Sequence, residues 1–380
     1  MTTPASGPDP TVPLAREASA YTRLGLVVDA RAVALALVIA ACFIAVIELR
    51  LHARGFRPTV LDSPELWAHW RREANALGEN ALVFVGASRM QLGIDPATVT
   101  RTTPHSPVQL AIDASFPLPV LEHLADDPGF RGHVIMDFYP AAVTTTDRDD
   151  DAARYVRQFE AQRPPGYLPT FDRTEPWLRD RVRWSLASYA DGASPWQSLW
   201  LRVLAPAATP GYLVTWPDRS READYALVPM PDFALGRAVR HLETAPRDHD
   251  GPEPVRTLAE LDAAVISIRS PTTTPPEFLA GVERIAALAR RLAERGASLT
   301  VVQMPTSGYV REIDRRRFPR ALFWDVLAAR LREIPVTTLY FADAPALGHF
   351  ECPDGSHLDR RDRAAFTAAL MQALGRTPSP

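Results

Sequence analysis

The chain has 380 residues, of which 46% are hydrophobic and 23% are charged, and its formal net charge is -3. This length and apolar fraction allow one large domain or two small ones with a sizeable core, and they exclude a chain that is disordered throughout. The balanced charge and the dispersed basic residues argue against a nucleic-acid partner.

A polar tail and an apolar segment open the chain. Residues 1–23 are rich in Pro, Ser, Thr and Ala without periodicity, which predicts a disordered tail. Residues 24–50 are predominantly apolar and predict a transmembrane anchor, with Arg31 and Arg50 able to reach the two interfaces. A buried core helix is the alternative, although such a helix usually shows a polar stripe. Three arginines flank each end of the segment, so charge does not predict its orientation.

Residues 60–140 alternate between helical and strand patterns. Helices are expected at Pro64–Ala76 and Leu118–Leu124, and strands at Ala81–Val85, Val108–Ile112 and His133–Phe138. Strands separated by short helices predict an α/β fold with a doubly wound, mostly parallel sheet.

The α/β pattern stops in residues 141–275, which we interpret as a long insertion. A helix is expected at Arg179–Tyr189, and the insertion holds five of the eight tryptophans of the chain. These aromatic side chains either form a lid or sugar-binding surface, or pack into a small core of the insertion itself. They are Trp177, Trp184, Trp196, Trp200 and Trp216.

The α/β pattern resumes in residues 276–375, and residues 376–380 form a short tail. Apolar residues at helical spacing predict a helix at Pro276–Gly296, followed by a strand at Ser298–Gln303. The loop Met304–Gly308 would then lie at the carboxyl edge of the sheet, where it could line a pocket. The remaining expected elements are a helix at Arg320–Arg332, a strand at Thr337–Phe341 and a helix at Arg360–Leu374.

Ser88 stands in a small-residue turn directly after the apolar run Ala81–Val85. A serine in this position lies where open α/β sheets bind their ligands, at the carboxyl ends of the strands. The alternatives are a turn residue or a helix N-cap. The turn departs from the G-x-S-x-G pattern, because Met90 stands where that pattern has its second glycine.

Asp354 and His357 share a polar, turn-rich loop before the last predicted helix. A serine that attacks an acyl carbon needs an imidazole to take its proton and a carboxylate to orient that imidazole. The same loop also contains metal-ligand types, although without a paired ligand spacing, so a metal site is the alternative. Those residues are His349, Glu351, Cys352, Asp354, His357 and Asp359.

The segments V-G-A-S-R-M-Q-L-G-I-D-P (Val85 to Pro96) and D-G-S-H-L (Asp354 to Leu358) resemble the first and last motif blocks of the SGNH (GDSL-like) serine hydrolases. The resemblance is strongest to membrane-anchored members associated with acylation of cell-surface polysaccharides. It implies a flavodoxin-like, three-layer α/β fold. It also implies that Ser88 is the nucleophile, His357 the general base and Asp354 its orienting partner.

The two middle blocks of the family fit less closely. Gln109 to Ser115 occupies the place of the second block, with Ala114 where a glycine usually supplies an oxyanion NH. His133 to Pro140 occupies the place of the block that carries the oxyanion asparagine, and it contains no asparagine. The resemblance therefore assigns the oxyanion role to the backbone NH groups of Ser88 and Ala114. Asp137, in the same block, would repel an oxyanion unless it faces away or is neutralised.

The resemblance implies a membrane-anchored esterase or O-acyltransferase that acts on acyl esters, acetyl esters first among them, of cell-surface carbohydrate. It places the protein in a bacterial inner membrane as a single-pass protein with its domain outside the cytoplasm, and it suggests a multipass acyltransferase as partner. No cofactor is expected. A non-catalytic binding or assembly protein of envelope polysaccharide biosynthesis is the alternative. Cys42 lies in the apolar segment and Cys352 in the last loop, so no disulfide between them is expected.

Overall fold

The structure is a computed structural model of the chain, and it describes residues 29–144, 150–161, 184–188, 209–243 and 257–375. The chain divides into two compact units, Met1–Arg50 and Leu51–Pro380. The first contains most of helix α1 (Ala30–Ala53), which is long and apolar enough to span a membrane. The tails predicted at 1–23 and 376–380 lie outside the described residues, as does most of the helix predicted at Arg179–Tyr189.

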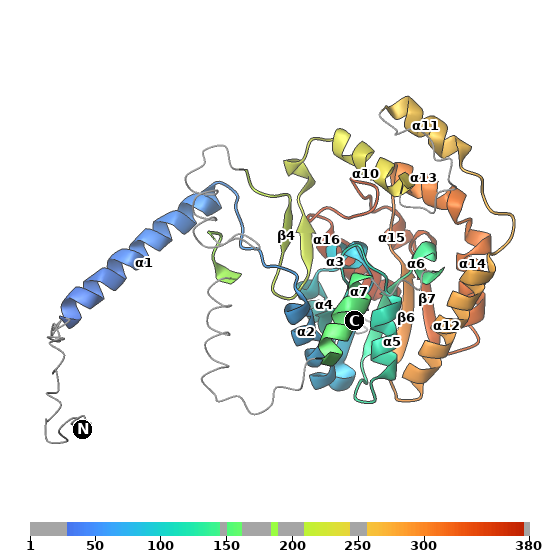
Figure 1. Ribbon diagram of the computed structural model, residues 1–380, viewed down its shortest axis with the longest axis horizontal. Coiled ribbons are helices and arrows are strands. Elements are labelled where there is room, and N and C mark those ends of the chain that lie inside the picture. Colours follow the sequence, from blue (N-terminus) through green and yellow to red (C-terminus); the bar gives the residue numbers. More distant parts are fainter. Residues whose placement is uncertain (1–28, 145–149, 162–183, 189–208, 244–256, 376–380) are drawn as a thin grey trace, which may run out of the picture. The chain divides into compact units, whose positions relative to one another are not determined.

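A five-stranded sheet forms the centre of the second unit, in the order β2-β1-β3-β6-β7 (Figure 1). All four strand pairings in it are parallel. Parallel strands require crossovers, which the intervening helices supply. The strands are β1 (Ala81–Val85), β2 (Ser106–Gln109), β3 (His133–Asp137), β6 (Ser298–Gln303) and β7 (Val336–Tyr340). The predicted α/β class with a parallel sheet is therefore confirmed.

Strand β1, which lies between β2 and β3, is buried on both faces, since all five of its residues are buried and consecutive side chains of a strand point in opposite directions. Val83 and Val85 belong to one apolar cluster, and Leu82 and Phe84 to another. The first cluster also includes buried side chains of α2 (Pro64–Ala76), α5 (Leu118–Asp126), α7 (Asp151–Ala161), α12 (Pro276–Ala293) and α14 (Trp324–Leu331). The second includes side chains of α3 (Ser88–Gly93), α4 (Pro96–Thr102), α15 (Pro345–Gly348) and α16 (Arg363–Ala373).

Parts of the predicted insertion pack directly on the α/β core. Helix α7 contacts α2 and α5, and its Tyr155 hydroxyl donates to the carbonyl of Asp62 at 2.9 Å. Two short strands, β4 (Leu213–Thr215) and β5 (Arg221–Ala223), form an antiparallel hairpin. Helices α10 (Asp232–Glu243) and α11 (Leu258–Ser267) share a small apolar cluster with Ile313 of α13 (Gly308–Arg317). The insertion thus supplies elements around the carboxyl edge of the sheet as well as on its flank.

Most predicted elements are present, and α2, β1 and β6 have the predicted bounds. Strand β2 ends at Gln109 instead of Ile112, although the NH groups of Leu110 and Ile112 still donate to the carbonyls of Phe84 and Gly86 beyond that point. The helix predicted from Arg320 breaks at the buried Phe323, which separates a short 3-10 helix from α14.

The last helix also begins later than predicted, and several elements were not predicted, namely the short strands and most helices between residues 140 and 275, α13 and α15. Helix α16 begins at Arg363, three residues after the predicted start, because the NH of Arg360 donates to the carbonyl of Ala223 in the hairpin. Helix α13 was not predicted, since its sequence is rich in arginine and only Val310, Ile313 and Asp314 are buried.

We expect Gly281→Ala to destabilise the protein. Gly281 lies where α12 packs on the short helix α6 (Pro140–Thr144), and an added Cβ would lie 2.4 Å from the Val143 carbonyl oxygen. Overpacking of this kind costs about 1–3 kcal/mol, which exceeds the gain in helix propensity of about 1 kcal/mol. Urea unfolding of the whole protein in detergent, followed by circular dichroism, measures the loss.

Gly236→Ala is the matched control, because its Cβ would meet only the end of the Arg240 side chain at 3.6 Å. This variant gains the same helix propensity without the overlap, so its free energy of unfolding should equal or exceed that of the wild type. Equal stabilities of the two variants would contradict the proposed close crossing at Gly281.

Candidate active site

Ser88 is the first residue of helix α3, directly after the turn that follows β1. The turn is tight: a Cβ on Gly86 would lie 3.0 Å from the Cβ of Asp137 and 3.2 Å from that of Met90. Ala87, not Ser88, occupies the N-cap position of α3, and no side chain caps this helix. The side chain of Ser88 is half-buried, and its hydroxyl is therefore available for another partner.

The order of the sheet places Ser88 beside a topological switch point. From β1, the chain continues first to β2 on one side and then to β3 on the other. Open α/β sheets bind ligands outside the carboxyl ends of the strands at such a point, because the two connections diverge there. Ser88 at the end of β1 and Asp137 at the end of β3 both lie at this edge.

The loop with Asp354 and His357 is fixed against the segment that follows β6. The NH of Ser307 donates to the carbonyl of Gly355 at 2.8 Å, and the Ser307 hydroxyl accepts from the NH of Cys352 at 2.9 Å. Gly355 has a φ of +90°, and a Cβ there would lie 2.5 Å from a methyl carbon of Val310. The sequence of this loop therefore needs glycine both for its backbone conformation and for its packing on α13.

Ser88, His357 and Asp354 meet in a hydrogen-bonded chain. The Nε2 atom of His357 lies 2.8 Å from the Oγ atom of Ser88, and its Nδ1 atom lies 2.7 Å from Oδ2 of Asp354. His357 and Asp354 are 5% and 4% exposed, so the chain is shielded from water except at the serine. The structure thus brings together the three predicted residues from loops 269 positions apart.

The carboxylate of Asp354 is held in its ionised form. Burial raises the pKa of this group, but the hydrogen bond and charge of His357, together with the NH groups of Ser356 and His357 at 2.9 and 2.8 Å, outweigh burial and leave the pKa well below its ordinary range. Burial and the charge of Asp354 also raise the pKa of Tyr225, so its phenol stays protonated. An ionised Asp354 favours the tautomer of His357 that carries a proton on Nδ1.

The pKa of His357 lies below its ordinary value. Burial is the main cause, and the nearby charge of Arg237 acts in the same direction, whereas Asp354 and Asp113 act against it. The imidazole is therefore neutral at neutral pH. With Nδ1 donating to Asp354, the lone pair on Nε2 faces the hydroxyl of Ser88 and can accept its proton.

The carboxylate of Asp137 is paired with the guanidinium of Arg89, so it does not place an unpaired charge beside the site. Its Oδ2 atom accepts from Nε of Arg89 at 3.0 Å, and its Oδ1 atom accepts from the NH of Met304 at 3.3 Å. The Arg89 guanidinium also lies over the ring of Tyr139, 5.2 Å from its centroid. The repulsion expected from the sequence is therefore offset by a cation that directly follows Ser88 in the chain.

Ala114 lies at the same edge in an unusual backbone conformation. Its φ is +52°, which is uncommon for a residue other than glycine. Arg221 of β5 binds the carboxylate of the neighbouring Asp113 at 2.5 Å. The oxyanion role of Ala114 stays a prediction, and the carboxylate of Asp113 lies next to the NH that this role requires.

Arg237 of α10 is a neighbour of His357 that the sequence did not indicate. Its Nη2 atom lies 3.3 Å from Nε2 of His357, and its Nε atom donates to the hydroxyl of Ser356 at 3.2 Å. Arg237 lies in the insertion, 120 positions before His357, where no motif marks it. Only the tertiary structure reveals the contact between Arg237 and His357.

The structure also shows where the possible metal ligands, the two cysteines and two of the five tryptophans of the insertion lie. Among the described residues, no group of three or more His, Cys, Asp or Glu side chains is arranged to hold a metal ion. Cys42 and Cys352 are both free thiols, and burial raises the pKa of Cys352 to about 12. Trp177, Trp196 and Trp200 lie outside the described residues, whereas Trp184 and Trp216 are half-buried.

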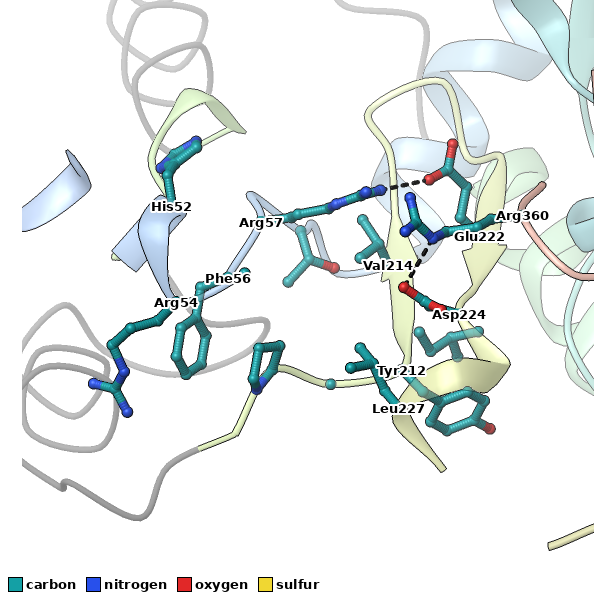
Figure 2. Close-up of a pocket in the computed structure, with 15 residues that line it drawn as sticks. His52, Arg54, Phe56, Arg57, Tyr212, Val214, Glu222, Asp224, Leu227 and Arg360 are labelled. Carbon is teal, nitrogen blue, oxygen red and sulfur yellow. Dashed lines mark hydrogen bonds and ion pairs between the residues drawn. The ribbon is translucent and has the colours of Figure 1, made fainter. Parts of the chain in front are cut away.

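Two cavities lie near the candidate site, and Ser88 lines neither of them. A mostly apolar cavity of about 170 Å³ lies behind the triad, between α10 and the loop Met304–Gly308, and reaches Asp354. A larger cavity of about 460 Å³ lies beside the β4–β5 hairpin, where Arg57 pairs with Glu222 and Arg360 pairs with Asp224 (Figure 2). Neither cavity reaches the hydroxyl of Ser88, so the triad itself defines the candidate site.

We expect the wild-type protein to lose stability relative to His357→Gln as the pH falls from about 7 to about 5. The folded-state pKa of His357 lies below its unfolded value, so acid favours the unfolded chain, which binds the proton more readily. The slope contributed by one such group is at most about 1.4 kcal/mol per pH unit. Urea unfolding at several pH values measures it.

His349→Gln serves as the control, because it removes an exposed histidine from the same segment. Its stability should follow that of the wild type at each pH. A constant difference between wild type and His357→Gln over this range would mean that His357 is not held neutral by its surroundings.

Neither a family model nor a curated protein matches this chain. The function of the Ser88 site is therefore inferred from its geometry and from the resemblance of its motif blocks.

Proposed function

We propose that the protein is a membrane-anchored serine esterase or O-acyltransferase of the SGNH type, in which Ser88, His357 and Asp354 form a catalytic triad. The observation that carries this proposal is the pair of hydrogen bonds at 2.8 and 2.7 Å that join the three side chains. Distances of this length are those at which a base can activate a serine. The order β2-β1-β3-β6-β7, which has the flavodoxin-like arrangement, supports the fold part of the proposal.

In the proposed reaction, Nε2 of His357 takes the proton of Ser88 as its Oγ forms a bond to the acyl carbon of an ester. The tetrahedral intermediate collapses when His357 gives this proton to the leaving alcohol, and an acyl-enzyme remains. Water or a second alcohol then attacks the acyl carbon, again losing its proton to His357. Ser88 regains the proton when the new acid or ester leaves.

The NH of Ser88 would hold the oxyanion, because Ser88 begins a helix and its NH has no intrahelical acceptor. A second donor would be the NH of Ala114, although the carboxylate of the adjacent Asp113 places a negative charge beside it. Loss of one oxyanion donor costs about a hundredfold to a thousandfold in rate. A slow or highly selective enzyme is consistent with this arrangement.

Helix α1 supports the membrane part of the proposal, since its 24 residues span about 36 Å at 1.5 Å per residue. The substrate class, acyl esters of cell-surface carbohydrate, and the position of the domain outside the cytoplasm follow from the resemblance of the motif blocks. The same resemblance suggests a multipass acyltransferase as the source of acyl groups in the transfer reaction.

A non-catalytic binding protein is the second candidate, and the absence of an oxyanion asparagine in His133–Pro140 favours it. A site that has lost its oxyanion donors can retain the triad as a hydrogen-bonded structure without turnover. Covalent capture of the serine separates the two candidates, because only an activated hydroxyl reacts.

We expect a fluorophosphonate probe to label the wild-type protein and not Ser88→Ala. Aryl acetate turnover should fall at least about ten-thousandfold in this variant, because the nucleophile is lost while binding remains. Mass spectrometry of the labelled peptide and a chromogenic ester assay measure the two effects.

Ser298→Ala is the control, because Ser298 begins β6 and pairs with His133 at the opposite edge of the sheet. This variant should label and turn over like the wild type. Absence of labelling in folded wild-type protein, under conditions in which a known serine hydrolase reacts, would favour the binding protein.

The rate should rise with pH through a pKa below 6.5 and then stay constant near neutrality. The base must be neutral to accept a proton, and the surroundings of His357 lower its pKa. The groups that face it are Asp354, Arg237 and Asp113. Measurement of kcat/KM from about pH 5 to about pH 9 gives the profile. An acid limb centred well above 6.5 would contradict the role assigned to His357.

A further inference from the structure

Arg237 reaches the candidate active site from the middle of α10, an element of the insertion. Its guanidinium lies along the imidazole of His357, with Nε on the hydroxyl of Ser356 and Nη2 at 3.3 Å from Nε2. Nε2 also faces the hydroxyl of Ser88 at 2.8 Å. The guanidinium of Arg237 and the hydroxyl of Ser88 therefore both lie within hydrogen-bond distance of Nε2.

Arg237 shares its counterion with His357 in the part of the chain that the structure describes. Its Nε atom lies 3.8 Å from Oδ2 of Asp354, and this oxygen already accepts from Nδ1 of His357 at 2.7 Å. The side chain of Arg237 is 34% exposed, and no described group hydrogen-bonds its Nη1 atom. By contrast, Arg89 and Arg221 at the same edge are paired with Asp137 and Asp113.

The position of Arg237 identifies the half of the substrate that it would meet. In the proposed reaction, Nε2 of His357 gives its proton to the oxygen of the leaving alcohol, so that alcohol lies beside Nε2. The oxyanion, in contrast, lies beside the NH of Ser88. A guanidinium in contact with Nε2 therefore borders the alcohol half of the ester, not the oxyanion.

We propose that Arg237 is a specificity residue that binds an anionic group, a carboxylate or a phosphate, on the alcohol half of the ester or on the acyl acceptor. This inference rests on the function proposed above. The planar guanidinium offers paired NH donors that match either group, and part of it is open to solvent. The substrate class narrows accordingly from acylated alcohols to acylated alcohols that bear a negative charge.

The cation of Arg237 opposes protonation of the base, and the reaction would be favoured by a bound anion that offsets this charge, which supports the proposal. A positive charge next to Nε2 disfavours protonation of His357, and therefore opposes the first step of the reaction. A bound anion offsets this charge at the moment when His357 must accept a proton. Arg237 would in this way make the base stronger when the anionic substrate is bound.

The test compares two acetyl esters, those of 3-hydroxybenzoate and 3-hydroxybenzamide, which differ by one charge and little in shape. With each rate corrected for that of alkaline hydrolysis, the wild-type ratio of kcat/KM, charged over neutral, should exceed about ten. In Arg237→Gln the ratio should fall to about one, and Arg237→Lys should keep part of the preference. A wild-type ratio near one, or an unchanged ratio in Arg237→Gln, would overturn the proposal.

Arg240→Gln is the matched control, since it removes the same charge from an exposed position one turn further along α10. Its ratio should equal that of the wild type. A general effect of net charge on the attraction of anions would lower the ratio in both variants alike, and would count against a specific role of Arg237.

A binding measurement separates this inference from the proposed reaction. Titration of Ser88→Ala with 3-hydroxybenzoate, 3-hydroxyphenyl phosphate and 3-hydroxybenzamide requires no turnover. An anion should bind at least about tenfold more tightly than the amide, and Arg237→Gln in the Ser88→Ala background should remove the difference. The tighter anion identifies carboxylate or phosphate. Equal binding of all three would refute the anion site, whereas anion binding without wild-type turnover would refute only the reaction.

Discussion

A buried guanidinium holds together the edge of the sheet on which the candidate site is built. Arg219 is fully buried and donates to both oxygens of Asp62 at 2.6 and 3.0 Å, and to the carbonyls of Gln109 and Ala111 at 2.6 and 2.9 Å. A buried charge costs several kcal/mol unless it is paired in this way. Gln91 of α3 donates to the same Asp62 carboxylate and the same Ala111 carbonyl. The Ser88 helix and the end of β2 therefore share one polar network with the hairpin.

This hairpin also determines where the histidine loop lies. Just after His357, the carboxylate of Asp359 accepts from the NH of Tyr225, and the NH of Arg360 donates to the carbonyl of Ala223. The loop is held on its other side by Ser307. Ser88 and His357 thus come from distant parts of the sequence, but both are fixed against one element of the insertion. The short distance between Ser88 and His357 depends on that common support.

The sequence predicts those parts of the site that local chemistry determines. The apolar run of β1, the small residues after it and the Asp-x-x-His loop are each visible within a few residues, and the parallel sheet brings them to one edge. Arg219 and Arg237 are not visible, because both lie in the insertion, where neither periodicity nor a motif distinguishes them from the other arginines. Long-range ion pairs leave no local pattern.

The charges around His357 divide the site into two unlike halves. On the side of Ala114, Arg221 is already paired with the carboxylate of Asp113, so little positive potential remains for an oxyanion. On the other side, Arg237 presents a cation whose described carboxylate partner, Asp354, is shared with His357. In the proposed reaction, a neutral ester would gain nothing from this cation, which weakens the base. An anionic alcohol would gain an ion pair and offset the effect on the base, so that binding of the anion and activation of the serine would occur together.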